Sequence, residues 1–361
     1  MFRIRLSESA MPTGSKDPDV LLAWLLDSMG LVRRKSEGMS IDDEQGALHR
    51  LMRETLLSEP LKGWDTKSLG DASGLSQTGM HHQLVKLRES GLVAAETEGR
   101  WHIHVLRGGS ISAAVDLVSV QARAILDLRL SEVAERVTES DDRMVVPSED
   151  GGGGFQIEIA EPGATVEGED RLDALMRDLG LNGERGKHND RLARQLFEEI
   201  SSSGQATTLL ALADKTGDSR SRVQRAVERM RAAGIAERVP MLDRIAQDVY
   251  AGLMRQHDAR GEEWLMTRGG LGRLDESVSK SLIAGVRKKS LNIEKVQDIL
   301  APVPLDAQRV LLNTLGGRMP YGIRISGRDG AAVKERVMRQ TDRTLRRLRT
   351  VAQRLDESLA S

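Results

Sequence analysis

Apolar residues recur at helical spacing near the middle of the first half of the chain, behind a glycine and a serine. Met80, Leu84 and Leu87 fall at i, i+4 and i+7, which places them in one stripe on a helix. Gly74 suits the tight turn before this helix because glycine readily adopts the left-handed conformation. Ser76 is a good N-cap residue, since its hydroxyl accepts a hydrogen bond from an unpaired backbone N–H. The pattern predicts two helices joined by a tight turn, a helix-turn-helix.

An alternating pattern follows the second of these helices, which ends at Gly91. Apolar Trp101, Ile103 and Val105 alternate with polar Arg100, His102 and His104. This is the period of a half-buried strand, so we expect the two histidines to lie on its exposed face. Glu98 and Gly99 favour a turn before it. Residues 92–106 are therefore predicted to form a β-hairpin.

These features together resemble the winged-helix domain of the ArsR-type repressors of bacteria and archaea. The residues that carry the resemblance are LSQTGMHHQLVKLRESGLV (75–93) and EGRWHIHVL (98–106), in a stretch of about 40 positions. The resemblance implies that the helix from Ser76 to Ser90 enters a DNA major groove while the hairpin touches the DNA backbone. Metal-sensing members of that family use cysteine ligands. This chain has no cysteine, which excludes a thiolate metal switch.

The helix-turn-helix pattern occurs a second time. A shift of 143 positions aligns residues 69–93 with residues 212–236 without a gap. The shared positions are stripe, cap and turn positions, so the match argues for a common fold rather than a common ligand. Beyond Val239, Pro240 precedes an apparent helix, so the second wing is predicted to be short or missing. A short hairpin is expected separately at 321–325.

The polar faces of the two second helices carry the candidate chemistry. In the first unit, the expected DNA-binding residues are Gln77, Thr78, His81, His82, Lys86, Arg100 and His102. In the second unit they are Arg220, Arg222, Gln224, Arg225 and Arg229. Arginine is well matched to phosphate and to the guanine edge. The alternative is a solvated helix surface with i,i+4 ion pairs, for which this stretch offers only Glu228 as a partner.

The remaining segments have distinct compositions. The expected organisation is an N-terminal segment and helix (1–40), a winged-helix domain (41–109), a long connecting or dimerisation helix (110–137), an acidic glycine-containing segment (138–186), a second helix-turn-helix domain (187–240), and a helical C-terminal region with a basic last helix (241–361). Residues 1–18 are expected to be poorly anchored. The long helix 110–137 either builds a dimer interface, as the resemblance implies, or packs on the chain's own helix 19–31.

The acidic segment has 13 acidic and 3 basic residues between positions 138 and 184. Three interpretations remain open: a solvated spacer, a surface for a basic protein, or a mimic that folds back on the chain's own basic helices. Short strands are expected within it at 144–146 and 155–160.

Composition narrows the class of protein. Lys and Arg total 53 against 54 Asp and Glu, so the chain as a whole has no charge that attracts nucleic acid, and only the local distribution is informative. The absence of cysteine fits a cytoplasmic location, and no apolar run is long enough to cross a membrane. Aromatic residues make up 2%, which argues against base-stacking platforms for single strands.

No motif indicates catalysis. The histidine pairs 81–82 and 102/104 would need a third ligand to hold a metal, so we expect no enzyme activity, no metal and no cofactor. The prediction is a mainly α protein with tandem winged-helix or helix-turn-helix units, a small β-hairpin wing and a helical C-terminal domain. Its expected function is transcriptional regulation by binding double-stranded DNA, as a monomer or a homodimer. The alternatives are a tandem winged-helix protein that docks other proteins and a chromosome-organisation or replication factor without strong sequence specificity.

Overall fold

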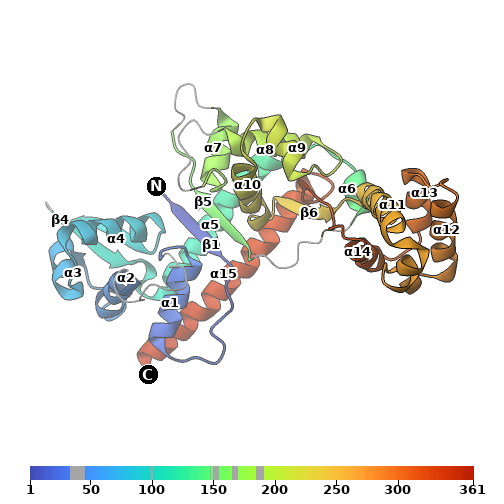
Figure 1. Ribbon diagram of the computed structural model, residues 1–361. Helices are drawn as coiled ribbons and strands as arrows, with labels where there is room; N and C mark the ends of the chain where they lie inside the picture. Colours follow the sequence, from blue (N-terminus) through green and yellow to red (C-terminus); the bar gives the residue numbers. More distant parts are fainter. Residues whose placement is uncertain (33–44, 99–100, 147, 149–153, 165–169, 184–190) are drawn as a thin grey trace.

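A computed structural model describes residues 1–32, 45–98, 101–146, 148, 154–164, 170–183 and 191–361 of the chain. Within these residues the protein is mainly helical, with three small antiparallel sheets. Most helices pack around one continuous apolar core. Helices α11 to α14 surround a second core and form a separate lobe at one end of the molecule (Figure 1).

The first half of the chain builds one set of elements. They are β1 (Arg3–Ser7), α1 (Pro18–Ser28), α2 (Gln45–Leu51) with the π-helical turn η1 (Met52–Leu56), β2 (Trp64–Asp65), α3 (Thr66–Ser73), α4 (Gln77–Glu89), β3 (Val93–Glu98), β4 (Trp101–Leu106), the short 3₁₀ turn η2 (Arg107–Gly109) and α5 (Ile111–Ala134). The hairpin β3–β4 is confirmed, and β2 adds to the other edge of β4 to give the order β2-β4-β3. Ser110 caps α5, as its hydroxyl accepts from the N–H of Ala113.

The second half builds a similar set. After the single turn of α6 (Asp142–Val145) come β5 (Gln156–Ala160), α7 (Arg171–Asp178), α8 (Leu192–Ser202), α9 (Leu209–Thr216), α10 (Arg220–Ala232), β6 (Ala236–Pro240), β7 (Tyr321–Ile325) and α15 (Gly330–Ala360). Strand β7 pairs with β6 along its length and also bridges to Thr207, just before α9. This repeats the arrangement of β2, β4 and β3 in the first half.

The hairpin β6–β7 is interrupted by residues 241–320. These residues contain α11 (Leu242–Thr267), the short turn η3 (Leu271–Arg273), α12 (Glu276–Arg287), α13 (Ile293–Leu300) and α14 (Leu305–Thr314). The prediction of a short or missing second wing was therefore wrong: the strand at 236–240 is present, and its partner lies at 321–325. The hairpin that was expected within 321–325 alone does not form, since those residues are one strand. A local pattern cannot reveal a partner that a whole lobe separates in sequence.

The two halves are joined by two antiparallel pairings. Strand β1 pairs with β5, so that Ile4 lies opposite Ile159 and Leu6 opposite Ile157, all four buried. Helix α5 packs along α15 in the opposite direction: the N-terminal N–H groups of α5 at Ile111 and Ser112 donate to the carboxylate of Asp356, near the C-terminus of α15. Neither expected role of helix 110–137 describes this packing, because the main partner of α5 is α15 rather than α1, and α1 itself also packs on α15.

Two further expectations were wrong for the same reason. The N-terminal residues are anchored, since β1 is the partner of β5. The acidic segment is not a spacer, because its apolar residues join the main core; these are Phe155, Ile157, Ile159, Leu172, Leu175 and Met176. The strand expected at 155–160 is confirmed as β5, whereas residues 142–145 form α6 instead of a strand. Among the acidic residues of these elements, Asp178 is buried and forms an ion pair with Arg129, and Glu158 forms ion pairs with Arg3 and Arg5 of β1. The stretch RRKSEGMS (33–40), whose composition predicts a linker, lies outside the described residues.

Candidate nucleic-acid interface

Helix α4 is positioned by the local signals that the sequence contains. Gly74 ends α3 in the left-handed conformation with φ 67°. The Ser76 hydroxyl accepts from the N–H of Gly79 at 3.2 Å. The stripe Met80, Leu84 and Leu87 is buried against the core. The predicted contacts Gln77, Thr78, His81 and His82 are all exposed, and they lie together on the outer face of the first two turns.

Helix α10 repeats this arrangement with other side chains. Gly217 has φ 70°, and Ser219 caps the helix by accepting from the N–H of Arg222 at 3.4 Å. The buried stripe is Val223, Val227 and Met230. Arg220, Arg222, Gln224 and Arg225 are exposed on the outer face, where the first unit has Gln77, Gly79, His81 and His82.

The arginines of α10 differ in their partners. Arg222 forms an ion pair with Asp218, one turn earlier, so Glu228 is not the only acid within reach of this helix. The Arg225 Nε donates to the backbone oxygen of Ser221 at 3.2 Å. Arg220 forms no ion pair or hydrogen bond with any described residue. The outer face of α10 therefore has a surplus of positive charge at its N-terminal end.

Arg229 does not belong to this exposed face, which corrects its assignment as a DNA contact. Its Nε donates to the backbone oxygen of Leu181 at 2.7 Å, and the side chain is half-buried. It ties α10 to the chain that follows α7. Lys86, at the equivalent position of α4, is also half-buried. At both positions the third turn of the helix faces the rest of the protein, so a cationic side chain there packs against it instead of projecting into solvent.

Strand β4 of the first unit buries one of the two histidines that were predicted to be exposed. His102 is exposed as expected, but His104 is buried, with 3% of its surface accessible. Leu106 must reach the core beside Val93, and alternate residues of a strand share one face, so His104 is carried inward with Leu106. Burial lowers the pKa of His104, and the nearby charges of Arg88 and His102 lower it further. Arg100 lies outside the described residues.

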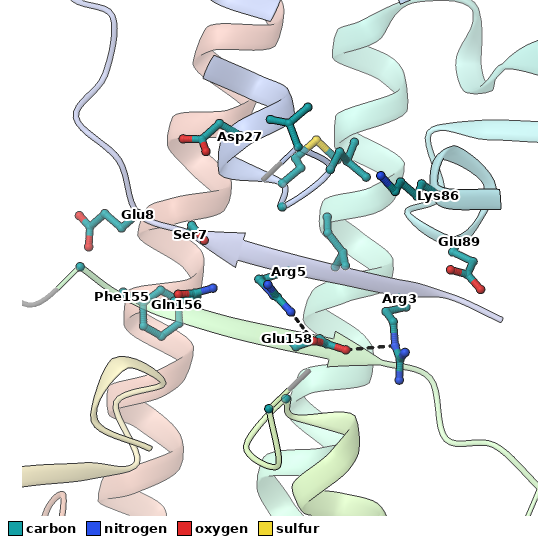
Figure 2. Close-up of a pocket in the computed structure, with 18 of the residues that line it drawn as sticks. Arg3, Arg5, Ser7, Glu8, Asp27, Lys86, Glu89, Phe155, Gln156 and Glu158 are labelled. Carbon is teal, nitrogen blue, oxygen red and sulfur yellow. Dashed lines mark hydrogen bonds and ion pairs between the residues drawn. The ribbon is translucent and has the colours of Figure 1, made fainter. Parts of the chain in front are cut away.

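A groove of about 1100 Å³ lies between α4 and the outer face of the β1–β5 sheet (Figure 2). His82, Lys86 and Glu89 of α4 line one side, and Gly180, Asn182 and Gly183 after α7 line another. Across its floor, Glu158 forms ion pairs with Arg3 at 3.1 Å and Arg5 at 3.3 Å. Acidic and basic groups alternate here, so the groove is not a uniform phosphate-binding surface.

The described residues provide no group of three or more histidine, cysteine, aspartate or glutamate side chains placed to hold a metal. In the same part of the chain, no helix has the length and apolar character needed to span a membrane. No protein-family model matches the chain, and no curated protein or solved structure is similar enough to it to give a match.

Sequence reasoning missed the wider repeat that organises the molecule. FRIRLSE (2–8) at β1 matches FQIEIAE (155–161) at β5 with a shift of 153. LLDSMGL (25–31) matches LMRDLGL (175–181) with a shift of 150. The two stretches end α1 and α7 with the same pattern of backbone hydrogen bonds, three, four and five residues back. The signal was present, but each segment has its own shift because the connecting loops differ in length.

Proposed function

We propose that this chain is a DNA-binding protein with two winged-helix units, in which α4 and α10 enter DNA grooves. The observation that carries the proposal is the matched exposure of the two helices. Each follows a tight glycine turn, buries an apolar stripe and presents only polar or cationic side chains along the outer face of its first two turns. A helix held in this way has the form that major-groove readers use.

The strands beside each helix support the same proposal. In both halves two antiparallel strands follow the second helix; in the first half β2, before the first helix, adds to them, and in the second half a single bridge at Thr207 takes the place of β2. This is the order of elements in a winged-helix unit. The exposed faces of α4 and α10 are suited to different parts of the DNA. The first offers amide, hydroxyl and imidazole groups that discriminate base edges, whereas the guanidinium groups of the second bind any phosphate as well as guanine.

Transcriptional regulation is the role we propose for such a protein. The alternative, that the units dock other proteins, requires apolar side chains on the outer faces of α4 and α10. Those faces carry instead Gln77, Thr78, His81 and His82 on α4 and Arg220, Arg222, Gln224 and Arg225 on α10.

The test is the salt dependence of binding to duplex DNA. Arg220, Arg222 and Arg225 are changed together to alanine, and affinity for random duplex DNA is measured between about 50 and 200 mM salt. Each lost phosphate contact should lower the slope of log K against log salt by about 1, so the triple variant should lose up to about 3.

The matched control removes the same charge elsewhere. Arg268, Arg273 and Lys288 are exposed on the lobe of α11 to α14, and their side chains form no hydrogen bond or ion pair with any described residue. Changing these three to alanine should leave the slope unchanged. Equal slopes for the native chain and the α10 variant would show that this helix does not touch DNA. An equal fall of the slope in the α10 variant and in the lobe variant would mean that the net charge of the chain, rather than contact by α10, sets the salt dependence.

A further inference from the structure

The pairings between the two halves have the pattern of an approximate two-fold rotation, with two pairs of equivalent residues at its axis. In the β1–β5 pairing, the shift of 153 makes Arg5 equivalent to Glu158, and these two residues lie directly opposite each other. At the two ends of the pairing, the N–H of Glu8 donates to Phe155 O at 2.7 Å, and the N–H of Glu161 donates to Phe2 O at 2.9 Å. These bonds are mirrored about the Arg5–Glu158 pair, as a two-fold requires.

The α5–α15 pairing has the same property. The caps Ser110 and Asp329 are equivalent with a shift of 219, since each accepts from the N–H three residues on. That shift makes Arg123 equivalent to Asp342, and these two side chains form an ion pair at 2.9 Å. In both pairs of equivalent residues, Arg5–Glu158 and Arg123–Asp342, an arginine of the first half therefore meets an acidic residue of the second half.

Helices α4 and α10 lie on the same side of the body. The groove over the outer face of β1–β5 is lined by His82 and Lys86 of α4 and, at its other margin, by Gly183. The guanidinium of Arg229 on α10 packs against Gly183. Two segments related by a two-fold rotation run in inverted orientation, so we take α4 and α10 to be inverted about the axis at Arg5 and Glu158.

We infer that a single chain binds DNA with both α4 and α10, and that its DNA site is a pair of unlike half-sites in inverted orientation. This inference rests on the proposed function. The two-fold of a DNA-binding protein is mirrored in the symmetry of its site. Here the pairings between the halves are nearly symmetric, whereas the exposed faces of α4 and α10 differ. The face of α4 carries Gln77, Thr78, His81 and His82, and the equivalent positions of α10 carry Arg220, Ser221, Gln224 and Arg225. The site is therefore inverted in geometry and unsymmetrical in sequence.

The elements that would otherwise join two copies are already occupied within the chain. Strand β1 is covered by β5 and helix α5 by α15. Two first halves brought together in the same way would place Arg5 against Arg5 and Arg123 against Arg123. The opposite charges at both axis positions thus favour the pairing of unlike halves, which a single chain provides.

The test makes the two reading faces alike. Arg220→Gln, Ser221→Thr, Gln224→His and Arg225→His give α10 the outer residues of α4, all at exposed positions. Sites for the full-length native chain and for this variant are then selected from random duplex DNA. The native chain should select an unsymmetrical two-part site, and the variant should select a palindrome with the same spacing. Inserting five base pairs between the halves should weaken binding of either protein about tenfold or more, because one half-site is lost.

The outcomes separate the inference from the proposed function. A direct repeat, an unchanged site, or two chains bound per site would overturn the inference while leaving DNA binding intact. Failure of the native chain to bind any duplex would overturn the proposed function itself. Footprinting of the native chain gives a second measurement that needs no refolded variant. It should show two protected patches, and His81→Ala should weaken only one of them. Protection of a single patch would also contradict the inference.

Discussion

Arg5 and Glu158 lie opposite each other at the centre of the β1–β5 pairing, and their side chains form an ion pair at 3.3 Å. Glu158 also pairs with Arg3, so one carboxylate holds two guanidinium groups on strand β1. If the two halves had identical sequences, this position would hold two like charges. The pairing of the halves thus depends on a difference between them.

Reversal of this charge should weaken the joint between the halves. Glu158→Arg places three cationic side chains together, and we expect the free energy of unfolding in urea to fall by roughly 1–2 kcal/mol. The double variant Arg5→Glu/Glu158→Arg restores an opposite pair and should recover most of the loss. If the double variant is no more stable than the sum of its single changes predicts, the two side chains are not coupled.

Arg143 should be among the most sensitive positions of the protein. Its buried guanidinium donates to the backbone oxygens of Thr138, Ser201, Ser203 and Arg328, which tie α8 and the start of α15 to the segment after α5. Arg143→Ala leaves these acceptors unsatisfied, so unfolding in urea should require about 3 kcal/mol less.

The control for Arg143 is its neighbour Arg328. The Arg328 side chain is about half exposed and pairs with Glu139 and Asp141 at the surface. Arg328→Ala should change stability little, because the backbone oxygen that Arg143 uses remains in place. Comparable losses in both variants would mean that general charge effects, rather than the buried donors, account for the result.

Buried His104 should make the first unit less stable in acid. Its pKa in the folded chain is lowered below the ordinary 6.5, chiefly by burial, so the folded state disfavours the protonated ring. The stabilisation is present above pH 6.5 and is lost as the pH falls through the folded pKa. Protection of the β3 and β4 amides from exchange, corrected for the intrinsic slowing of exchange in acid, should therefore fall as the pH drops below about 6.5.

His104→Gln should flatten this pH dependence, since the variant has no titrating ring at that position. The exposed neighbour provides the control: His102→Gln should keep most of the dependence. An unchanged profile in His104→Gln would assign the acid sensitivity to another group.

The lobe of α11 to α14 should be removable. It has its own apolar core, and it leaves and re-enters the fold at adjacent points, where the N–H of Met241 donates to Pro320 O at 3.0 Å. Replacing residues 242–319 by Asn-Gly should close a two-residue hairpin between β6 and β7. The shortened chain should keep the main thermal transition within a few degrees and bind DNA with an unchanged salt slope. Aggregation or loss of the β6–β7 pairing would show that the lobe supports the rest of the fold.

Local features of the fold could be predicted from the sequence. The turn at Gly74, the cap at Ser76 and the stripe of Met80, Leu84 and Leu87 are set by residues within one or two turns of each other. The same holds for the repeat at α9 and α10. The exposed face of each helix followed directly from the stripe, so most of the candidate contacts lie where they were expected.

Long-range pairings could not be predicted in the same way. Strand β5 was identified, but nothing local indicates that its partner is β1, more than 150 residues earlier. Strand β7 was separated from β6 by a whole lobe. His104 and Arg229 were misplaced because their polarity suggested solvent, whereas the parity of β4 and the packing of α10 on the chain after α7 decided their burial.

The interrupted hairpin has a consequence for synthesis on the ribosome. Strand β6 is made 80 residues before β7, since residues 241–320 lie between them. At about 5–20 residues per second, the second sheet waits roughly 4–16 s for its other strand. The first sheet, whose strands β3 and β4 are separated by two residues, closes almost at once. The nascent chain thus closes its first sheet early, and the lobe has time to fold before β7 can pair with β6.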